Sequence, residues 1–117
     1  QPLIQHEGIH LKYRELGSTG EMIPEIGLGT WKYQGGSEPL RKGIELGAYL
    51  IDTAEMYKTE NAVGVAIKDH RDKVFLATKV LGSNLRYDEV LKAAEKSLRL
   101  LEQDVIDLYQ IHWSTDI

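Results

Sequence analysis

Residues 49–80 of the chain, YLIDTAEMYKTENAVGVAIKDHRDKVFLATKV, decide its fold. The stretch opens with an apolar run at 49–52, continues through a helix-forming segment at 61–68 and ends in a second apolar run at 74–80. This order predicts two parallel strands joined by a helix. Both apolar runs are nearly continuous rather than alternating in polarity, so we expect the strands to be covered on both faces.

The same alternation continues on both sides of this stretch. Strands are expected at 26–30 and 105–112, and helices at 40–46 and 89–101. Ahead of them, the segment 11–26 contains a Gly-Ser-Thr-Gly turn between two short runs and predicts a β-hairpin. The whole pattern predicts an α/β fold with a parallel sheet, preceded by a hairpin.

Local signals mark the ends and the buried face of two helices. Ser37 is available as the N-cap of the first helix, Pro39 stands in its opening turn, and Gly47 follows its last residue. In the helix at 89–101, four apolar residues recur at helical spacing and predict the face that packs on the sheet: Leu91, Ala94, Leu98 and Leu101.

Composition limits the kinds of partner and the organisation of the chain. We interpret residues 1–10, which show no sustained periodicity, as an upstream extension or a cloning remnant, and residues 11–117 as one domain. The formal net charge is −4 and no segment gathers Lys and Arg, which argues against nucleic acid or an anionic membrane as partner. The chain has no cysteine, and its longest apolar run is too short to span a bilayer. A cytoplasmic location is the default expectation.

Three polar residues stand at the C-terminal ends of predicted strands, where the apolar runs do not explain them: Asp52, Lys79 and His112. The C-terminal ends of parallel strands meet at one edge of a sheet, which is where active sites form in barrels and open α/β sheets alike. Tyr57 follows Asp52 in the loop that leaves the same strand, so it can lie at the same edge. Asp107, at the start of its strand, is expected at the opposite edge in a stabilising role.

These residue types suit the reduction of a carbonyl group. An ammonium in an apolar strand is costly unless an anion compensates it, and Asp52 is the expected partner of Lys79. The same ammonium makes a nearby tyrosine a better acid, so Tyr57 is the expected proton donor to a carbonyl oxygen. A neutral His112 can donate a hydrogen bond to that oxygen and orient the substrate. None of these groups is a hydride source, so a reducing cofactor is expected.

Each residue also has a simpler structural interpretation when it is taken alone. Asp52 can cap a turn, and Tyr57 can be a half-exposed loop aromatic. Lys79 can extend into solvent, and His112 can be an ordinary hydrogen-bonded histidine. Their joint position at one edge favours function. A metal centre is not expected, because the four histidines form no short-spaced ligand pair on one strand or helix.

Four motifs resemble those of the aldo-keto reductases, and the resemblance runs from about Lys12 to Trp113. They are Gly27-Leu28-Gly29-Thr30-Trp31, Ile51-Asp52-Thr53-Ala54-Glu55-Met56-Tyr57, Ala77-Thr78-Lys79-Val80 and Asp107-Leu108-Tyr109-Gln110-Ile111-His112-Trp113. The resemblance implies the N-terminal half of a (β/α)₈ TIM barrel. It also implies an oxidoreductase that reduces an aldehyde or ketone to an alcohol by hydride transfer from NADPH.

The resemblance assigns roles to residues of these motifs. It implies a catalytic tetrad of Asp52, Tyr57, Lys79 and His112. It implies a substrate pocket lined by Trp31, Tyr57, His112 and Trp113. It implies contacts of Thr30 and Asp52 with the nicotinamide side of NADP(H), with NAD(H) left open as the cofactor.

Length sets a further expectation. A complete barrel takes about 250 residues, and only half of its strands can be counted in these 117 residues. In the family, later strands supply the residue that stacks on the nicotinamide and the basic residues that hold the phosphates. We therefore expect the chain to be inactive alone, and to self-associate or pair with a complementary half because its outer strands lack partners. The alternative function is a module that senses nicotinamide cofactor or binds a partner without turnover.

Overall fold

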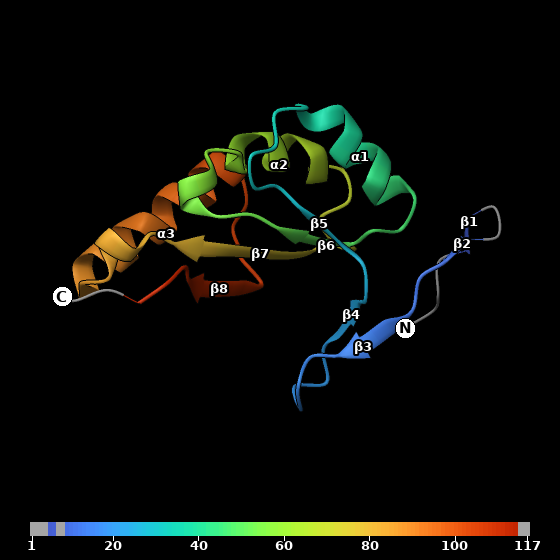
Figure 1. The fold of residues 1–117 in the computed structure, drawn as a ribbon, viewed down its shortest axis with the longest axis horizontal. Coiled ribbons are helices and arrows are strands. Elements are labelled where there is room, and N and C mark those ends of the chain that lie inside the picture. Colours follow the sequence, from blue (N-terminus) through green and yellow to red (C-terminus); the bar gives the residue numbers. More distant parts are fainter. Residues whose placement is uncertain (1–4, 7–8, 115–117) are drawn as a thin grey trace.

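The computed structural model describes residues 5–6 and 9–114, and Figure 1 shows their arrangement. In chain order the elements are β1 (Gln5–His6), β2 (Ile9–His10), β3 (Tyr13–Glu15), β4 (Met22–Pro24), β5 (Gly27–Gly29), α1 (Ser37–Glu45), β6 (Leu50–Asp52), η1 (Glu55–Tyr57), α2 (Glu60–Ile67), β7 (Phe75–Val80), η2 (Gly82–Asn84), α3 (Tyr87–Leu101) and β8 (Leu108–Ile111). The short 3₁₀ turns η1 and η2 were not predicted from the sequence.

Four strands form one parallel sheet in the order β5-β6-β7-β8. The register pairs Leu28 with Ile51, Ile51 with Leu76, and Thr78 with Tyr109. Helices α1, α2 and α3 alternate with these strands along the chain, which confirms the predicted βαβ pattern. Since the strands run in one direction, their C-terminal ends meet at a single edge.

The three α-helices lie on one face of this sheet, above it in Figure 1. The expectation that both faces are covered is therefore wrong for the described residues. Successive residues of a strand point to opposite faces, so Thr78 faces the helices, where it bonds Glu60, and Lys79 faces away from them. In a barrel the face opposite the helices is the interior, which strand side chains fill. The apolar runs fit that arrangement as well as they fit a sheet between two helical layers.

The core lies between the helices and the sheet. Five large apolar side chains there are at most 1% exposed: Ile44, Ile51, Ile67, Leu76 and Leu101. Each of them contributes about 1.5–3 kcal/mol through burial. This core fixes α1, α2 and α3 against the strands whose ends carry the polar residues.

Helix α1 ends as the sequence predicts but begins differently. Gly47 has φ 104°, its N–H donates to Ile44 O across 2.9 Å, and the following N–H donates to Gly43 O across 3.0 Å. This is a Schellman ending, which requires the left-handed conformation that glycine adopts without strain. At the other end Gly36 is the N-cap, with φ 73°, and Ser37 is already helical and makes no capping bond. The prediction of Ser37 as N-cap is wrong, because the chain enters the helix through a conformation that favours glycine.

Helix α3 is rotated from the predicted orientation, so that of the predicted stripe only Leu101 is fully buried. Its buried residues are Ala93, Ser97 and Leu101, whereas Leu91 is 48% exposed. The other two residues of the predicted stripe are half-buried. The helix is rotated so that the Ser97 hydroxyl donates to Glu60 of α2 across 3.0 Å. A buried hydrogen bond, which apolar periodicity does not register, accompanies this orientation.

The N-terminal segment contains two antiparallel pairs. β3 and β4 pair with Arg14 opposite Ile23, which confirms the predicted hairpin. β1 and β2 form a shorter pair that the sequence did not predict, within a predicted extension, residues 1–10, that lies partly outside the described residues. Among the helices of the described chain, none combines the length and apolar character that crossing a bilayer requires.

Candidate active site

Lys79 and Asp52 meet at the C-terminal edge of the sheet. Asp52 is the last residue of β6 and Lys79 the fifth of β7, and their side chains share the face opposite the helices. Lys79 Nζ donates to Asp52 Oδ1 across 2.7 Å and to Thr53 O across 3.0 Å. The Lys79 side chain is 17% exposed and that of Asp52 is 41% exposed. The predicted compensation of the strand ammonium by Asp52 is confirmed.

Tyr57 lies beside this pair. It ends the turn η1, and the next residue, Lys58, is left-handed with φ 60°, which turns the chain sharply toward α2. The Tyr57 hydroxyl accepts a hydrogen bond from Lys79 Nζ across 3.4 Å. The same ammonium is 5.0 Å from the centre of the Tyr57 ring, within the range of a cation–π contact. The phenol therefore faces a positive charge held by a carboxylate.

His112 completes the cluster. Its ring meets the Tyr57 ring edge to face, with centroids 5.4 Å apart and planes at 89°. Its Nδ1 is buried and has no hydrogen-bond partner among the described residues. Trp113 contacts His112 edge to face, with ring centroids 4.4 Å apart and planes at 60°. The structure thus brings together all four residues that the sequence placed at this edge.

The two tryptophans are among the more exposed large side chains. Trp113 is 52% exposed and Trp31, in the loop after β5, is 64% exposed. Lys32 Nζ lies 4.8 Å from the centre of the Trp31 ring. Among the described residues, Trp31 makes no hydrogen bond or aromatic contact with the other predicted site residues. It lies near the C-terminal edge of the sheet only because its loop follows the end of β5.

Thr30 is fully buried rather than exposed at the edge. Its hydroxyl donates to Asp52 O across 3.0 Å and accepts from the Thr59 hydroxyl across 3.1 Å. Thr59 in turn lies 3.1 Å from the Thr53 hydroxyl. This chain of threonines joins the loop after β5 to the loop that carries Tyr57. Sequence reasoning missed Thr53 and Thr59, because a single threonine near a motif carries no distinctive signal.

Two glutamates near the site were also missed. Glu60, at the start of α2, is 2% exposed and accepts hydrogen bonds from the hydroxyls of Thr78 and Ser97. Glu55 opens η1 and accepts hydrogen bonds from the Leu81 N–H and the Asn84 side chain. Their closeness in sequence to Tyr57 was the available signal, but acidic residues in a loop usually face solvent.

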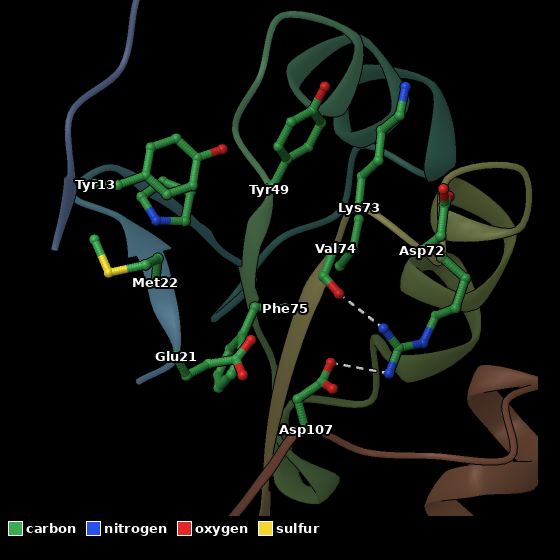
Figure 2. A pocket seen from close by; sticks show the side chains of 11 residues that line it. Tyr13, Glu21, Met22, Tyr49, Asp72, Lys73, Val74, Phe75 and Asp107 are labelled. Atoms are coloured by element: carbon green, nitrogen blue, oxygen red, sulfur yellow. Dashed lines mark hydrogen bonds and ion pairs between the residues drawn. The ribbon is translucent and has the colours of Figure 1, made fainter. Parts of the chain in front are cut away.

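A cavity of about 410 Å³ lies at the opposite edge of the sheet, between the hairpin and the starts of the strands (Figure 2). Within it Arg71 donates to Asp107 Oδ2 and to Val74 O, across 2.9 and 2.7 Å, and Figure 2 draws both bonds. Asp107 Oδ2 also accepts the Leu76 N–H across 2.8 Å. These bonds tie β7 to the start of β8, which confirms the position predicted for Asp107. The groups suited to carbonyl chemistry lie at the other edge.

Comparison with known proteins extends these observations. The model of the Aldo/keto reductase family matches residues 25–116. Methylglyoxal reductase YeaE of Escherichia coli is 46% identical over 103 residues, which cover 79% of this chain and 36% of that protein. Glyoxal reductase of Bacillus subtilis is 40% identical over 100 residues, which cover 80% of this chain and 36% of that protein. The chain thus spans about a third of the length of the curated relatives it matches.

Solved structures with a similar fold belong to the same family. The thermostable aldo-keto reductase Tm1743 superposes with a TM-score of 0.85 and 42% identity, over 90% of this chain and 44% of that one. An aldo/keto reductase from Klebsiella pneumoniae, in complex with NADP and acetate, superposes with a TM-score of 0.72 and 41% identity. The match covers 82% of this chain and 38% of that one. The fold is that of a partial (β/α)₈ barrel. From the family match and these similarities together, the chain belongs to the aldo/keto reductase family.

Proposed function

We propose that this chain carries the reacting residues of an NADPH-dependent carbonyl reductase. The observation that supports the proposal is the position of Lys79 Nζ, within hydrogen-bond distance of both Asp52 and the Tyr57 hydroxyl. The His112 ring against Tyr57 adds a second polar group at the same place. NADP in the related Klebsiella pneumoniae structure supports the choice of cofactor.

In this proposal Tyr57 is the general acid. Its O–H bond breaks as the proton passes to the carbonyl oxygen of the substrate, and the phenolate left behind is stabilised by the Lys79 ammonium. When bound, the reduced nicotinamide supplies the hydride that adds to the carbonyl carbon, so the product is an alcohol. Asp52 holds the Lys79 ammonium in place through the bond to its Oδ1, and His112 donates a hydrogen bond that orients the carbonyl oxygen.

The nicotinamide end of the cofactor fits the described residues. Asp52 uses Oδ1 for Lys79 and keeps 41% of its side chain exposed, which leaves acceptor capacity for a carboxamide N–H. Thr30 would act through Asp52, because its hydroxyl is fully buried and donates to the Asp52 carbonyl. We therefore propose Asp52 as a direct contact and Thr30 as its support.

Small dicarbonyl compounds are the proposed substrate class. Two relatives are named for the reduction of methylglyoxal and glyoxal, and these are the basis for this choice. Trp31 and Trp113, each more than half exposed, are the proposed apolar walls beside Tyr57.

The test is the replacement Tyr57→Phe in the complete protein, with NADPH consumption measured in the presence of methylglyoxal. We expect turnover to disappear while NADPH binding stays within a factor of about two, because the phenol proton is used only in the chemical step. Tyr87→Phe, at a tyrosine that is 79% exposed on α3, is the matched control and should keep full activity. An active Tyr57→Phe protein would refute the proposal. A wild-type protein that binds NADPH but reduces no carbonyl would instead favour the cofactor-sensing alternative.

A further inference from the structure

We propose that Glu55 is a positioning residue of this site. Its carboxylate ties the turn that carries Tyr57 to the loop that follows Lys79, and through that loop to Trp113. The role in catalysis rests on the proposed function, whereas the tie itself is a structural property that can be tested without turnover.

The contacts of Glu55 join two loops. Oε1 accepts the backbone N–H of Leu81 across 2.8 Å, and Oε2 accepts from Asn84 Nδ2 across 2.9 Å. Glu55 stands two residues before Tyr57, and Leu81 stands two residues after Lys79. One carboxylate therefore connects the chain segments next to both members of the proposed proton-donating pair.

Tyr57 needs such a tie because the sheet does not hold it. It lies in a three-residue turn beyond the end of β6, and the left-handed Lys58 follows it directly. Its contact with Lys79 is 3.4 Å long, so a small shift of the turn breaks it. Hydrogen bonds to a carboxylate are among the stronger ones in proteins, and Glu55 makes two of them.

The tie extends to the substrate side of the site. Gly82 follows Leu81, and a Cβ placed on Gly82 would lie 3.1 Å from Trp113 Nε1, so the indole packs directly on the backbone of η2. Trp113 contacts the His112 ring, and His112 contacts the Tyr57 ring. The contacts thus run from Glu55 through η2 and Trp113 back to Tyr57. A shift of η2 would therefore move both Trp113, the proposed wall of the substrate pocket, and Tyr57, the proposed general acid.

Exchanging the carboxylate of Glu55 and the amide of Asn84 gives a sharp test in the complete protein. Asn84→Asp alone places two carboxylates against each other and should lower kcat by about 10- to 100-fold. Adding Glu55→Gln to Asn84→Asp restores a donor and an acceptor with their positions exchanged, and kcat should return to within about threefold of wild type. The KM for NADPH should change by less than about twofold throughout, since no group that binds the cofactor is altered. Glu89→Ala is the control, because Glu89 lines a shallow surface pocket together with Glu55 and Asn84 and takes no part in the hydrogen bonds that join these two residues.

A second readout does not need activity. The indole Nε1–H signal of Trp113 in a ¹H–¹⁵N spectrum, assigned with Trp113→Phe, should shift in Glu55→Ala and in Asn84→Asp and return in the double variant. Backbone amide exchange at Leu81 should accelerate in Glu55→Ala and stay slow in the double variant. A double variant no better than Asn84→Asp alone, or a Glu55→Ala protein with unchanged kcat and Trp113 signal, would overturn the proposal. If the wild-type protein shows no turnover but the Trp113 signal still shifts in Glu55→Ala and Asn84→Asp, the proposed function is refuted. The structural link from Glu55 to Trp113 is then still supported.

Discussion

The ammonium of Lys79 is bonded to the carboxylate of Asp52 across 2.7 Å, between the ends of two neighbouring parallel strands. The pair is only partly buried, with Asp52 41% exposed, so its contribution to folding is small. In the proposed function, the role of the pair is to present a fixed positive charge to the Tyr57 hydroxyl. Activity and stability should therefore respond very differently when the pair is broken.

Lys79→Met should lower kcat for methylglyoxal by at least about 100-fold, because the phenolate left after proton transfer loses its stabilising charge. The free energy of unfolding should fall by no more than about 1 kcal/mol. Steady-state kinetics and urea denaturation measure the two effects. Lys68→Met, at the exposed end of α2, is the control and should change neither. Equal kcat values for the two variants would remove Lys79 from the mechanism.

Ser97→Ala should destabilise the protein by about 1–2 kcal/mol, since it leaves one oxygen of the buried Glu60 carboxylate without its donor. Ser37→Ala is the matched control, because Ser37 also lies in a helix but makes no capping hydrogen bond. It should stay within about 0.5 kcal/mol of wild type. Urea denaturation of both variants at one protein concentration gives the comparison. A larger loss for Ser37→Ala would restore it as the helix cap.

Tyr109 should cause a loss of stability at alkaline pH. Burial, with the negative charges of Glu55 and Glu60, raises the pKa of Tyr109 from its ordinary 10.0 to about 12. The pKa of Tyr109 is higher in the folded state than in the unfolded state. The stability that depends on a protonated Tyr109 is therefore fully present below pH 10 and is lost as the pH rises toward 12. Denaturation from pH 9 to 12 should show a steeper decline for wild type than for Tyr109→Phe.

Tyr109→Phe should itself be neutral or stabilising at neutral pH. The Tyr109 hydroxyl is buried and has no hydrogen-bond partner among the described residues, so its removal relieves a desolvation cost. Tyr87→Phe, at an exposed tyrosine, should leave the alkaline decline unchanged. A parallel decline for wild type and Tyr109→Phe would show that Tyr109 titrates normally.

The 117-residue chain by itself should bind NADPH weakly, with a Kd above about 1 μM. The expectation follows from the proposed contact set, in which Asp52 touches only the nicotinamide end and the residues for the phosphates remain unassigned. A fluorescence titration of NADPH measures the affinity. Sub-micromolar binding would mean that the described residues hold more of the cofactor than Asp52 and Thr30 can explain.

The same chain should also self-associate. In the described sheet β8 pairs only with β7, and Val105 and Ile111 beside this edge are 58% and 61% exposed. An unpaired parallel strand with apolar neighbours favours association with another chain or with a complementary half of the barrel. Sedimentation velocity over a range of concentrations tests this. A monodisperse monomer that unfolds cooperatively would contradict it.

The sequence by itself determined the parallel sheet and the membership of the polar cluster. Continuous apolar runs separated by helix-length segments leave few topologies other than βαβ, and parallel strands place all of their C-terminal ends at one edge. Asp52, Lys79 and His112 could therefore be grouped without coordinates, and Tyr57 followed from its short distance to Asp52.

Only the tertiary structure decided which side chains support that cluster. The burial of Thr30, the carboxylate of Glu60 facing Ser97, and the tie from Glu55 to Leu81 all depend on contacts between segments 22 to 37 residues apart. Helix α3 shows why, since its periodicity favours Leu91 while a hydrogen bond accompanies the burial of Ser97. Periodicity reports how apolar a face is. It carries no information on which buried polar group another segment will satisfy, because that depends on distances fixed only when the segments pack.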